Sequence, residues 1–549
     1  MFDMPNRSDV YLHDTPDKAA FDRGNRRMSN GCIRVHKPLD FAALVLGERL
    51  DVICEEVATG ATIRKPLPKP LPVFVIYQTA FASDDQRLEV RPDFYGRDAS
   101  RIIASPHLGA LTRSADIAPR RGFRSLAWSD GEDPMTPRDA LIARLDADAE
   151  EIIAFLQRFV QAPSPNPPGD TRAAAAVVTA FLDANGLPWR RIAPVAEWPN
   201  IVGSFECGRP GRHLVLNGHM DVFPVDESEA WTEGPWSGAR AGGCIWGRGV
   251  ADMKAGTTAS IMAYRYLHPL RDRLAGRLTL TAVSDEETFG PYGSRWLVAN
   301  VPEVLGDCVL NGEPSSPHTI RFGEKAPLWL RFTVRTPGAH GAYTHLSASA
   351  TKIAARLIAD LEAVAGERFA PPGRIAEALA AGAAAADRAM GPGAAAIADR
   401  LTLNIGTISG GLKVNMIPGA SSFEADFRLP VGATREHVLA RIAPILARFP
   451  EATMEELNST EPAACDPFHE MVGILRANAR AATGIDPQPI LSLGGTDARL
   501  WRQRGIPAFV YGPHPTGMGG RDEHVAIDEF LAIVKVHVLS AYDYLGGPR

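Results

Sequence analysis

The chain has 549 residues and a net charge of −6, with 22% charged and 45% hydrophobic residues. This length predicts three or more domains. Without a basic excess we expect no nucleic-acid partner, and without a long uncharged apolar run we expect no membrane partner. The six cysteines form no CxxC pair and the start has no signal-peptide pattern, so we expect a cytoplasmic protein without a disulfide framework or a thiolate zinc site.

The first segment, residues 9–35, reads DVYLHDTPDKAAFDRGNRRMSNGCIRV. It resembles the second half of an L,D-transpeptidase catalytic domain, a cysteine enzyme that cross-links peptidoglycan stem peptides. The resemblance implies His13 as the base and Cys32 as the nucleophile, because an imidazole can activate a thiol for acyl transfer. Asn30 stands where the family more often has His, and the strands that precede HDTP in the family are missing. We therefore predict a partial, β-rich module over 1–105 and favour a remnant over an active transpeptidase.

Residues 106–138 are rich in Pro, Gly, Arg, Ser and Asp without sustained periodicity, which predicts a linker. The next segment, DALIARLDADAEEIIAFLQRFVQ, is apolar at helical spacing and predicts one helix. SPNPPGDT ends that helix, and TRAAAAVVTAFLDANG predicts the next one, capped by Gly186. These helices open a catalytic domain that begins at residue 139.

Several acids and histidines stand at or just past the ends of β-branched, apolar runs, such as HLVLN, GRLTLTAV and CVL. Active sites of open α/β sheets collect at the carboxyl ends of the strands, so this placement predicts one shared site. A carboxylate and imidazole set without Cys suits divalent metals, zinc above all. The members of the set are His219, Asp221, Asp252, Glu286, Glu287, Glu313 and His524.

A two-metal hydrolase needs a shared carboxylate, further ligands for each ion, and a free carboxylate that takes a proton from the attacking water. Because neighbours on an extended segment point to opposite sides, one of Glu286 and Glu287 can bind metal while the other faces the water. Asp221, two residues after His219, is placed to fix the imidazole tautomer. The GRG tripeptide upstream gives the chain room to swing Asp252 into the cleft.

The ordered motifs GHMDVFPV, GRGVADMKAG, SDEETFGPYGS, NGEPS, GAHGAYTH, VNMIPG, DFRLP, GGTDAR and DEHV resemble one family of dinuclear zinc metallopeptidases. It is the family of acetylornithine deacetylase, succinyl-diaminopimelate desuccinylase and glutamate carboxypeptidase. The resemblance runs from about residue 139 to the C-terminus and implies two divalent ions, zinc in preference to cobalt. It also implies Glu286 as the general base, Asp252 as the bridging ligand and a cis peptide bond after Asp252. The implied ligands are His219, Asp252 and Glu313 for one ion, and Asp252, Glu287 and His524 for the other.

The predicted fold class is α/β: a zinc-peptidase-like catalytic domain with a mixed sheet flanked by helices, and an inserted α+β domain. The insert is predicted over 322–435, which divides the catalytic domain into 139–321 and 436–549. It matches the lid domain through which the family dimerises, so we expect a homodimer. The Ala-rich stretch near 377–400 is predicted to be helical, because Ala is the best helix former. We expect it to be a surface insertion; the alternatives are that it widens the dimer surface or covers the cleft.

His340, in GAHGAYTH, matches the family's lid histidine, which reaches the partner subunit's site and steadies the oxyanion of the tetrahedral intermediate. His345 is the second candidate for that role. His340 is therefore expected to lie far from the metal cluster of its own chain.

Four residues match positions that contact substrate. Asn415 in VNMIPG and Arg428 in DFRLP match contacts to carbonyl or carboxylate groups, and an arginine fork is a natural partner of a carboxylate. Gly495 and Thr496 in GGTDAR offer backbone amides for a terminal carboxylate. For each of these alone, a structural role is an equal alternative.

These observations predict a metal-dependent hydrolase that cleaves an N-acyl or peptide bond in a small amino-acid-derived substrate with a free carboxylate. The partner is then an N-acyl amino acid or a short peptide, and the reaction is of the deacetylase, desuccinylase or carboxypeptidase type. Two alternatives remain: acyl transfer through Cys32, and a non-catalytic dimerisation or binding protein. Sensitivity to chelators separates the metal-dependent hydrolase from both alternatives. Alkylation of Cys32 identifies acyl transfer through that thiol.

Overall fold

The computed structural model describes residues 12–13, 33–35, 37–59, 65, 80–82, 88–90, 136–226 and 228–547. The chain divides into two compact units, Met1–Arg120 and Arg121–Arg549, and each is described by itself. Within the described residues, no helix is long and apolar enough to cross a membrane.

The first unit contains a parallel strand pair in which His13 lies opposite Arg34. Cys32 and any contact between its thiol and His13 lie outside the described residues. The elements of this unit are β1 (Leu12–His13), β2 (Ile33–Arg34), α1 (Pro38–Leu46), α2 (Leu50–Ala58), β3 (Ala80–Ala82) and β4 (Leu88–Val90).

The second unit is built on a nine-stranded mixed sheet in the order β19-β12-β21-β11-β7-β10-β6-β5, with β20 paired to β12. Its three central strands, β11, β7 and β10, run parallel to one another. The buried runs of these strands are mostly apolar, as expected for strands covered on both faces, with buried threonine and asparagine residues among them. The strands are β5 (Arg190–Ile192), β6 (Asn200–Glu206), β7 (Arg209–His219), β10 (Ala275–Val283), β11 (Cys308–Asn311), β12 (Thr319–Glu324), β19 (Ala463–Ala464), β20 (Gln488–Ser492) and β21 (Ala508–Val510).

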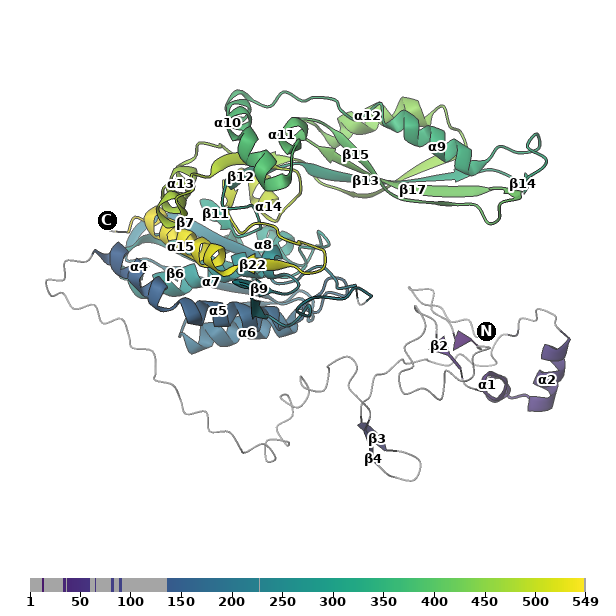
Figure 1. Ribbon diagram of the computed structural model, residues 1–549, viewed down its shortest axis with the longest axis horizontal. Coiled ribbons are helices and arrows are strands. Elements are labelled where there is room, and N and C mark those ends of the chain that lie inside the picture. Colours follow the sequence, from purple (N-terminus) through teal and green to yellow (C-terminus); the bar gives the residue numbers. More distant parts are fainter. Residues whose placement is uncertain are drawn as a thin grey trace. The chain divides into compact units, whose positions relative to one another are not determined.

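Helices cover this sheet, and a small sheet of β8 (Arg240–Ala241), β9 (Cys244–Trp246) and β22 (His524–Ala526) lies beside it (Figure 1). The central helix α7 is buried along its whole length. The helical segments are α4 (Pro137–Ala147), α5 (Ala149–Val160), α6 (Arg172–Ala184), η2 (Val250–Lys254), α7 (Ala255–Leu267), η3 (His268–Arg273), α8 (Ser294–Asn300), η4 (Pro302–Val304), α13 (Glu470–Thr483), α14 (Ala498–Arg502) and α15 (Ile527–Tyr544).

The single helix predicted after the linker is two helices. Asp148 has φ −94° and ψ 8°, which ends α4 and precedes α5. Its carboxylate accepts one local hydrogen bond, from Arg144, and one from a distant part of the chain, the hydroxyl of Tyr266. The helix predicted next is confirmed as α6, and Gly186 follows its end with φ 61°.

The inserted domain is a four-stranded antiparallel sheet in the order β15-β17-β13-β18. Buried and half-buried residues alternate along β13 and β17, because one face packs on α9 and α12. β18 and α12 lie at or beyond the predicted boundary at residue 435, so the lid extends further than predicted. Its elements are β13 (Ala326–Arg335), β14 (Ala339–His340), α9 (Ala350–Leu361), α10 (Gly373–Met390), α11 (Ala394–Ile397), β15 (Thr402–Gly410), β16 (Met416–Ile417), β17 (Ala420–Leu429), α12 (Arg435–Leu446) and β18 (Ala452–Ser459).

The Ala-rich stretch forms α10, as predicted, but it is not a surface insertion. α10 packs against β20 and β12 of the catalytic sheet. The buried residues of α10 are small, Ile375 and Leu379 pack beside them against the core, and a Cβ atom added to Gly382 would lie 2.6 Å from the carbonyl oxygen of Pro489. The helix therefore lies within the inserted sequence but belongs to the packing of the catalytic domain.

Candidate metal centre

Three parallel strands bring the predicted ligands together. His219 is the last residue of β7, Glu286 follows the end of β10, and Glu313 follows the end of β11. β7 lies between the other two strands, and Val283 of β10 is in register with His219. The carboxyl ends of all three strands thus meet at one edge of the sheet, as the sequence predicts.

The distances define a compact cluster around one imidazole. Nε2 of His219 lies 3.2 Å from Oδ1 of Asp252 and 3.3 Å from Oε1 of Glu313. Two sets of ligand atoms, each with its members within 4.8 Å of one another, could hold a cation. These sets are His219, Asp252 and Glu287, and His219, Glu286 and Glu313.

The cluster is buried, and its polar atoms have few partners. Among the described residues, no hydrogen bond reaches Nε2 of His219, Oδ1 of Asp252 or Oε1 of Glu287, although each atom is shielded from solvent. Leaving such a group unpaired costs about 1–3 kcal/mol, and more if it is charged. A divalent cation would satisfy these atoms, because imidazole nitrogen and carboxylate oxygen are its usual ligands. The residues present therefore fit a metal centre.

The tautomer of His219 is fixed differently from the prediction. Nδ1 of His219 lies 2.8 Å from the backbone carbonyl oxygen of Asp221, whereas the nearest carboxylate oxygen of Asp221 is 3.6 Å away. That carboxylate instead accepts hydrogen bonds from the side chain of Asn166, at 2.9 Å, and from the backbone amide of Glu287, at 3.1 Å. Asp221 thus orients His219 through its main chain and holds the next ligand segment through its side chain.

The acids Glu286 and Glu287 lie in a turn, so the extended segment expected for them is wrong. Asp285 has φ 67°, and the amide of Phe289 donates to the carbonyl oxygen of Glu286 at 2.7 Å, which closes the turn directly after β10. The two carboxylates nevertheless separate as required, since each belongs to a different set of ligand atoms around His219.

The segment before Asp252 is shaped by glycine. Gly249 has φ 76°, and a Cβ atom there would lie 2.0 Å from Cγ1 of Val222, so only glycine fits without rearrangement. This agrees with the room that the GRG tripeptide was expected to provide. The peptide bond between Asp252 and Met253 is cis, as predicted.

His524 is the predicted ligand that lies in neither set of clustered atoms. It begins β22, which pairs with β9, and its ring stacks on Trp246 with 4.1 Å between ring centroids. Nδ1 of His524 lies 2.8 Å from the carbonyl oxygen of Asp522, as Nδ1 of His219 lies beside Asp221. The assignment of His524 to a second cation stays a prediction.

The predicted lid residues divide between two places. His340 is exposed on β14, at the tip of the lid sheet and away from the catalytic sheet (Figure 1). Asn415 is beside it, because its carbonyl oxygen accepts a hydrogen bond from Gly341 at 2.7 Å. Arg428 lies near the opposite end of β17, in register with Pro327, and its guanidinium is paired with Asp426 at 2.9 Å.

The amide of Thr496, predicted to bind a substrate carboxylate, already has a carboxylate partner. Both the amide and the hydroxyl of Thr496 donate to Glu324, each at 2.8 Å, and Arg502 donates to the same carboxylate at 2.7 Å. Gly495 lies beside this cluster, where a Cβ atom would contact Phe289 and Glu324. These contacts give Thr496 a structural role, and substrate binding by Gly495 and Thr496 stays a prediction.

Arg499 was missed by the sequence analysis, although it closes the quoted GGTDAR motif. Its guanidinium is 2% exposed and lies 3.6 Å from Oε1 of Glu286. It also stacks over the ring of Phe289, at 4.6 Å from the centroid. A buried cation beside the predicted base favours the ionised form of that base.

Burial and mutual repulsion shift the ionisation of the cluster. Burial raises the pKa of Glu313 to about 7, and Asp252 adds to the shift. Burial also raises the pKa of Glu286 and of Glu287 well above the usual range, assisted by neighbouring carboxylates. Burial disfavours the imidazolium of His219, but Glu313 and the other nearby acids outweigh it and hold the pKa of His219 well above its ordinary value.

We expect the metal-free protein to lose stability as pH rises from about 4.5, the usual Glu pKa, to about 7, the pKa of Glu313. In this window the folded state binds more protons than the unfolded state, so stability falls with pH. His219 acts in the same direction, because its raised pKa stabilises the fold at low pH and that contribution is lost as pH rises. Zinc replaces these protons, so calorimetric melting between pH 5 and 8 should show a weaker slope with zinc. A metal-free Tm that rises over this window would contradict the assignment.

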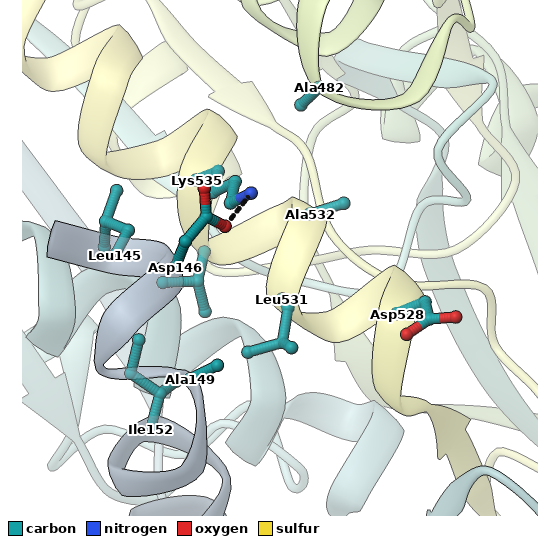
Figure 2. Close-up of a pocket in the computed structure, with 10 residues that line it drawn as sticks. Leu145, Asp146, Ala149, Ile152, Ala482, Asp528, Leu531, Ala532 and Lys535 are labelled. Carbon is teal, nitrogen blue, oxygen red and sulfur yellow. Dashed lines mark ion pairs between the residues drawn. The ribbon is translucent and has the colours of Figure 1, made fainter. Parts of the chain in front are cut away.

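A separate hollow of about 190 Å³ lies between α4, α5, α13 and α15 (Figure 2). Its wall carries an ion pair between Asp146 and Lys535. None of the predicted site residues lines it, and its remaining lining is mostly aliphatic. It has no part in the metal centre.

Imidazole and carboxylate groups gathered at the carboxyl edge of a mixed α/β sheet are the ligands that a metal-dependent hydrolase requires. Residues 215–543, more than half of the chain, match Peptidase family M20/M25/M40. The chain belongs to this metal-dependent family, which confirms the resemblance drawn from the motifs. Residues 1–69 match the L,D-transpeptidase catalytic domain, which confirms the second resemblance for that segment.

Relatives and solved structures agree with this assignment. A succinyl-diaminopimelate desuccinylase from Gluconacetobacter diazotrophicus is 28% identical over 406 residues, covering 70% of this chain and 94% of that enzyme. An M20 metallo-carboxypeptidase from Sulfolobus solfataricus has a TM-score of 0.62 at 18% identity, covering 72% of this chain and 99% of that one. A di-peptidase from Saccharomyces cerevisiae has a TM-score of 0.61 at 16% identity, covering 75% and 99%. The predicted catalytic fold is therefore confirmed.

Proposed function

We propose that the chain is a dinuclear, zinc-dependent amidohydrolase that cleaves the N-acyl or peptide bond of a small amino-acid-derived substrate with a free carboxylate. Cobalt is the second choice of metal. The observation that carries this proposal is the cluster of buried imidazole and carboxylate atoms without hydrogen-bond partners at the ends of three parallel strands. The likeness to a succinyl-diaminopimelate desuccinylase supports an acyl group and an amino acid as the two halves of the substrate.

Each residue of the centre has a proposed role. When bound, the cations would polarise the amide carbonyl and lower the pKa of water. Glu286 takes a proton from the attacking water as the new carbon–oxygen bond forms, and returns it to the amine as the carbon–nitrogen bond breaks. The proposed ligands are His219, Asp252 and Glu313 for one cation, and Asp252, Glu287 and His524 for the other.

The chain's other groups prepare this step. Asp221 holds the imidazole of His219 in one orientation, and burial excludes bulk water from the cluster. Arg499 lies beside Glu286 and favours the ionised carboxylate that accepts the proton. Gly495 and Arg428 remain proposed contacts of the substrate carboxylate, and Asn415 of its carbonyl oxygen.

The proposal is tested by hydrolysis of a panel of N-succinyl, N-acetyl and N-formyl amino acids and dipeptides by the full chain with added zinc or cobalt. Activity should disappear with a chelator, return with metal, and persist after alkylation of the thiols. Activity that resists chelation would remove the proposal. If activity is lost on alkylation and also in the Cys32→Ala variant, the alternative function is supported instead. That alternative is acyl transfer by the N-terminal segment that matches the L,D-transpeptidase catalytic domain.

We also propose that the chain works as a homodimer joined through the lid. β15 is an edge of the lid sheet, and Ile408 on it is 60% exposed. Beyond it, Leu412 and Val414 are almost fully exposed. An exposed apolar edge strand is a ready site for pairing with a second chain. His340 lies at the same end of the lid, where it could enter the partner's site.

We expect Ile408→Lys to produce a monomer with little activity, because a charge on the edge strand opposes pairing and removes His340 from the partner's site. Size-exclusion chromatography with light scattering reads the mass, and Thr453→Lys on the opposite edge strand is the matched control. Mixing Glu286→Gln chains with His340→Ala chains should restore activity to about a quarter of the wild-type value, since one site in each mixed dimer is complete. A fully active monomer would disprove the scheme.

A further inference from the structure

Glu523 occupies a cradle of hydrogen-bond donors directly behind Asp252. Its side chain is 1% exposed. One carboxylate oxygen accepts from the backbone amides of Ala251, at 2.9 Å, and Asp252, at 3.1 Å. The other accepts from the amide of Gly249, at 3.0 Å, and from Arg248, at 2.9 Å. A carboxylate with two donors on each oxygen has no lone pair left for a cation, so Glu523 is not itself a ligand.

The donors are available because the chain is irregular here. Gly249 has a left-handed backbone conformation, and Asp252 has φ −115° and ψ 96°. The amides of these residues are therefore not paired with carbonyl oxygens of a regular helix. Buried amides need an acceptor, and Glu523 supplies one for three of them at once. The conformation that aims Asp252 into the cluster therefore depends on this carboxylate.

The same short segment sets the next predicted ligand. Asp522, on one side of Glu523, accepts from Thr232 and turns its carbonyl oxygen to Nδ1 of His524. His524, on the other side, is held by β22 and by stacking on Trp246. Three consecutive residues thus link the loop that carries Asp252 with the strand that carries His524, although the two lie more than 270 residues apart in sequence.

We propose that Glu523 is a positioning residue. It holds Asp252 at a fixed position relative to His524, in the geometry needed to bind divalent cations. This inference rests on the proposed metal-dependent function and extends it to a residue that contacts neither cation nor substrate. Partners that orient metal ligands typically change metal affinity by 10- to 100-fold when removed.

The test compares Glu523→Gln with Glu324→Gln in the full chain. Glu324 is an equally buried glutamate that accepts from a backbone amide, a hydroxyl and an arginine, but it holds Thr496 and not Asp252. Glutamine keeps the shape of either side chain and removes one acceptor oxygen. Zinc is titrated calorimetrically into each metal-free protein in the presence of a competing chelator, and melting of the metal-free forms reports the loss of fold stability.

We expect Glu523→Gln to weaken zinc binding by about 10- to 100-fold, and Glu324→Gln to leave it unchanged. Turnover of Glu523→Gln should return towards the wild-type value when zinc is raised above the new Kd, which a general loss of stability would not allow. Glu523→Asp keeps the charge but withdraws the carboxylate, and should lie between wild type and Glu523→Gln if the latter fails to fold. Unchanged zinc affinity in the folded Glu523 variants, or an equal loss in Glu324→Gln, would overturn the proposal. A wild-type chain that binds neither zinc nor cobalt would overturn the proposed function together with it, so the two failures are distinguishable.

Discussion

The Glu286→Gln variant is expected to keep its metal and lose turnover by about 100- to 10,000-fold, the contribution usual for a general acid–base residue. Glutamine has the same shape but cannot take a proton from water. The side chain of Glu286 is 8% exposed, its Oε1 has no hydrogen-bond partner among the described residues, and Arg499 and the imidazole of His219 are the counter-charges beside it. The substitution therefore removes the base while the surrounding packing stays in place.

The measurement combines kcat at saturating substrate with the metal content of the purified protein. Glu362→Gln, an exposed residue at the end of α9, is the matched control and should retain full activity. A Glu286→Gln protein with wild-type turnover would exclude Glu286 as the base. A protein that has lost its metal would instead make Glu286 a ligand, consistent with its place beside His219 and Glu313 in one set of clustered atoms.

The second large effect is expected from Asp252→Asn. Oδ1 of Asp252 lies 3.2 Å from His219, and as the proposed bridging ligand Asp252 would serve both cations. Loss of its charge should lower zinc affinity by more than about 100-fold, because even a partner outside the ligand set contributes 10- to 100-fold. Bound zinc should fall below one ion per chain, and activity should fall with it.

Asp221→Asn is the matched comparison, since both aspartates are buried beside His219. Asp221 orients its neighbours without belonging to either set of ligand atoms, so its loss should weaken zinc binding less than the loss of Asp252. Calorimetric titration and metal analysis measure both variants. An Asp252→Asn protein that keeps one tightly bound zinc ion would show that Asp252 does not bridge.

The sequence predicted the parts of this site that depend on local order. His219, Glu286 and Glu313 could be placed at one edge because each follows an apolar run, and strands of such composition lie side by side in a buried sheet. The need for glycine before Asp252 was also predictable, because a close approach of the backbone to neighbouring atoms requires a residue without a side chain.

Contacts between distant segments could not be predicted. Glu523 was visible only as a neighbour of His524, and its role depends on amides far upstream in the chain. Thr496 was expected to offer its amide to substrate, but the carboxylate of Glu324, at the end of β12, accepts from that amide. The end of the lid was also placed too early, because β18 pairs with β13 across more than a hundred intervening residues.

The packing of α10 affects how far the lid can be treated as a portable module. The helix lies within the inserted sequence but rests on β20, and the approach of Gly382 to Pro489 leaves no space for a side chain. An engineer who exchanged residues 326–459 for the lid of a relative would also remove one wall of the catalytic domain. A chimaera would need to keep α10 from the host, or bring β20 along with the donor lid, so the boundary for recombination follows the packed surface and not the order of the sequence.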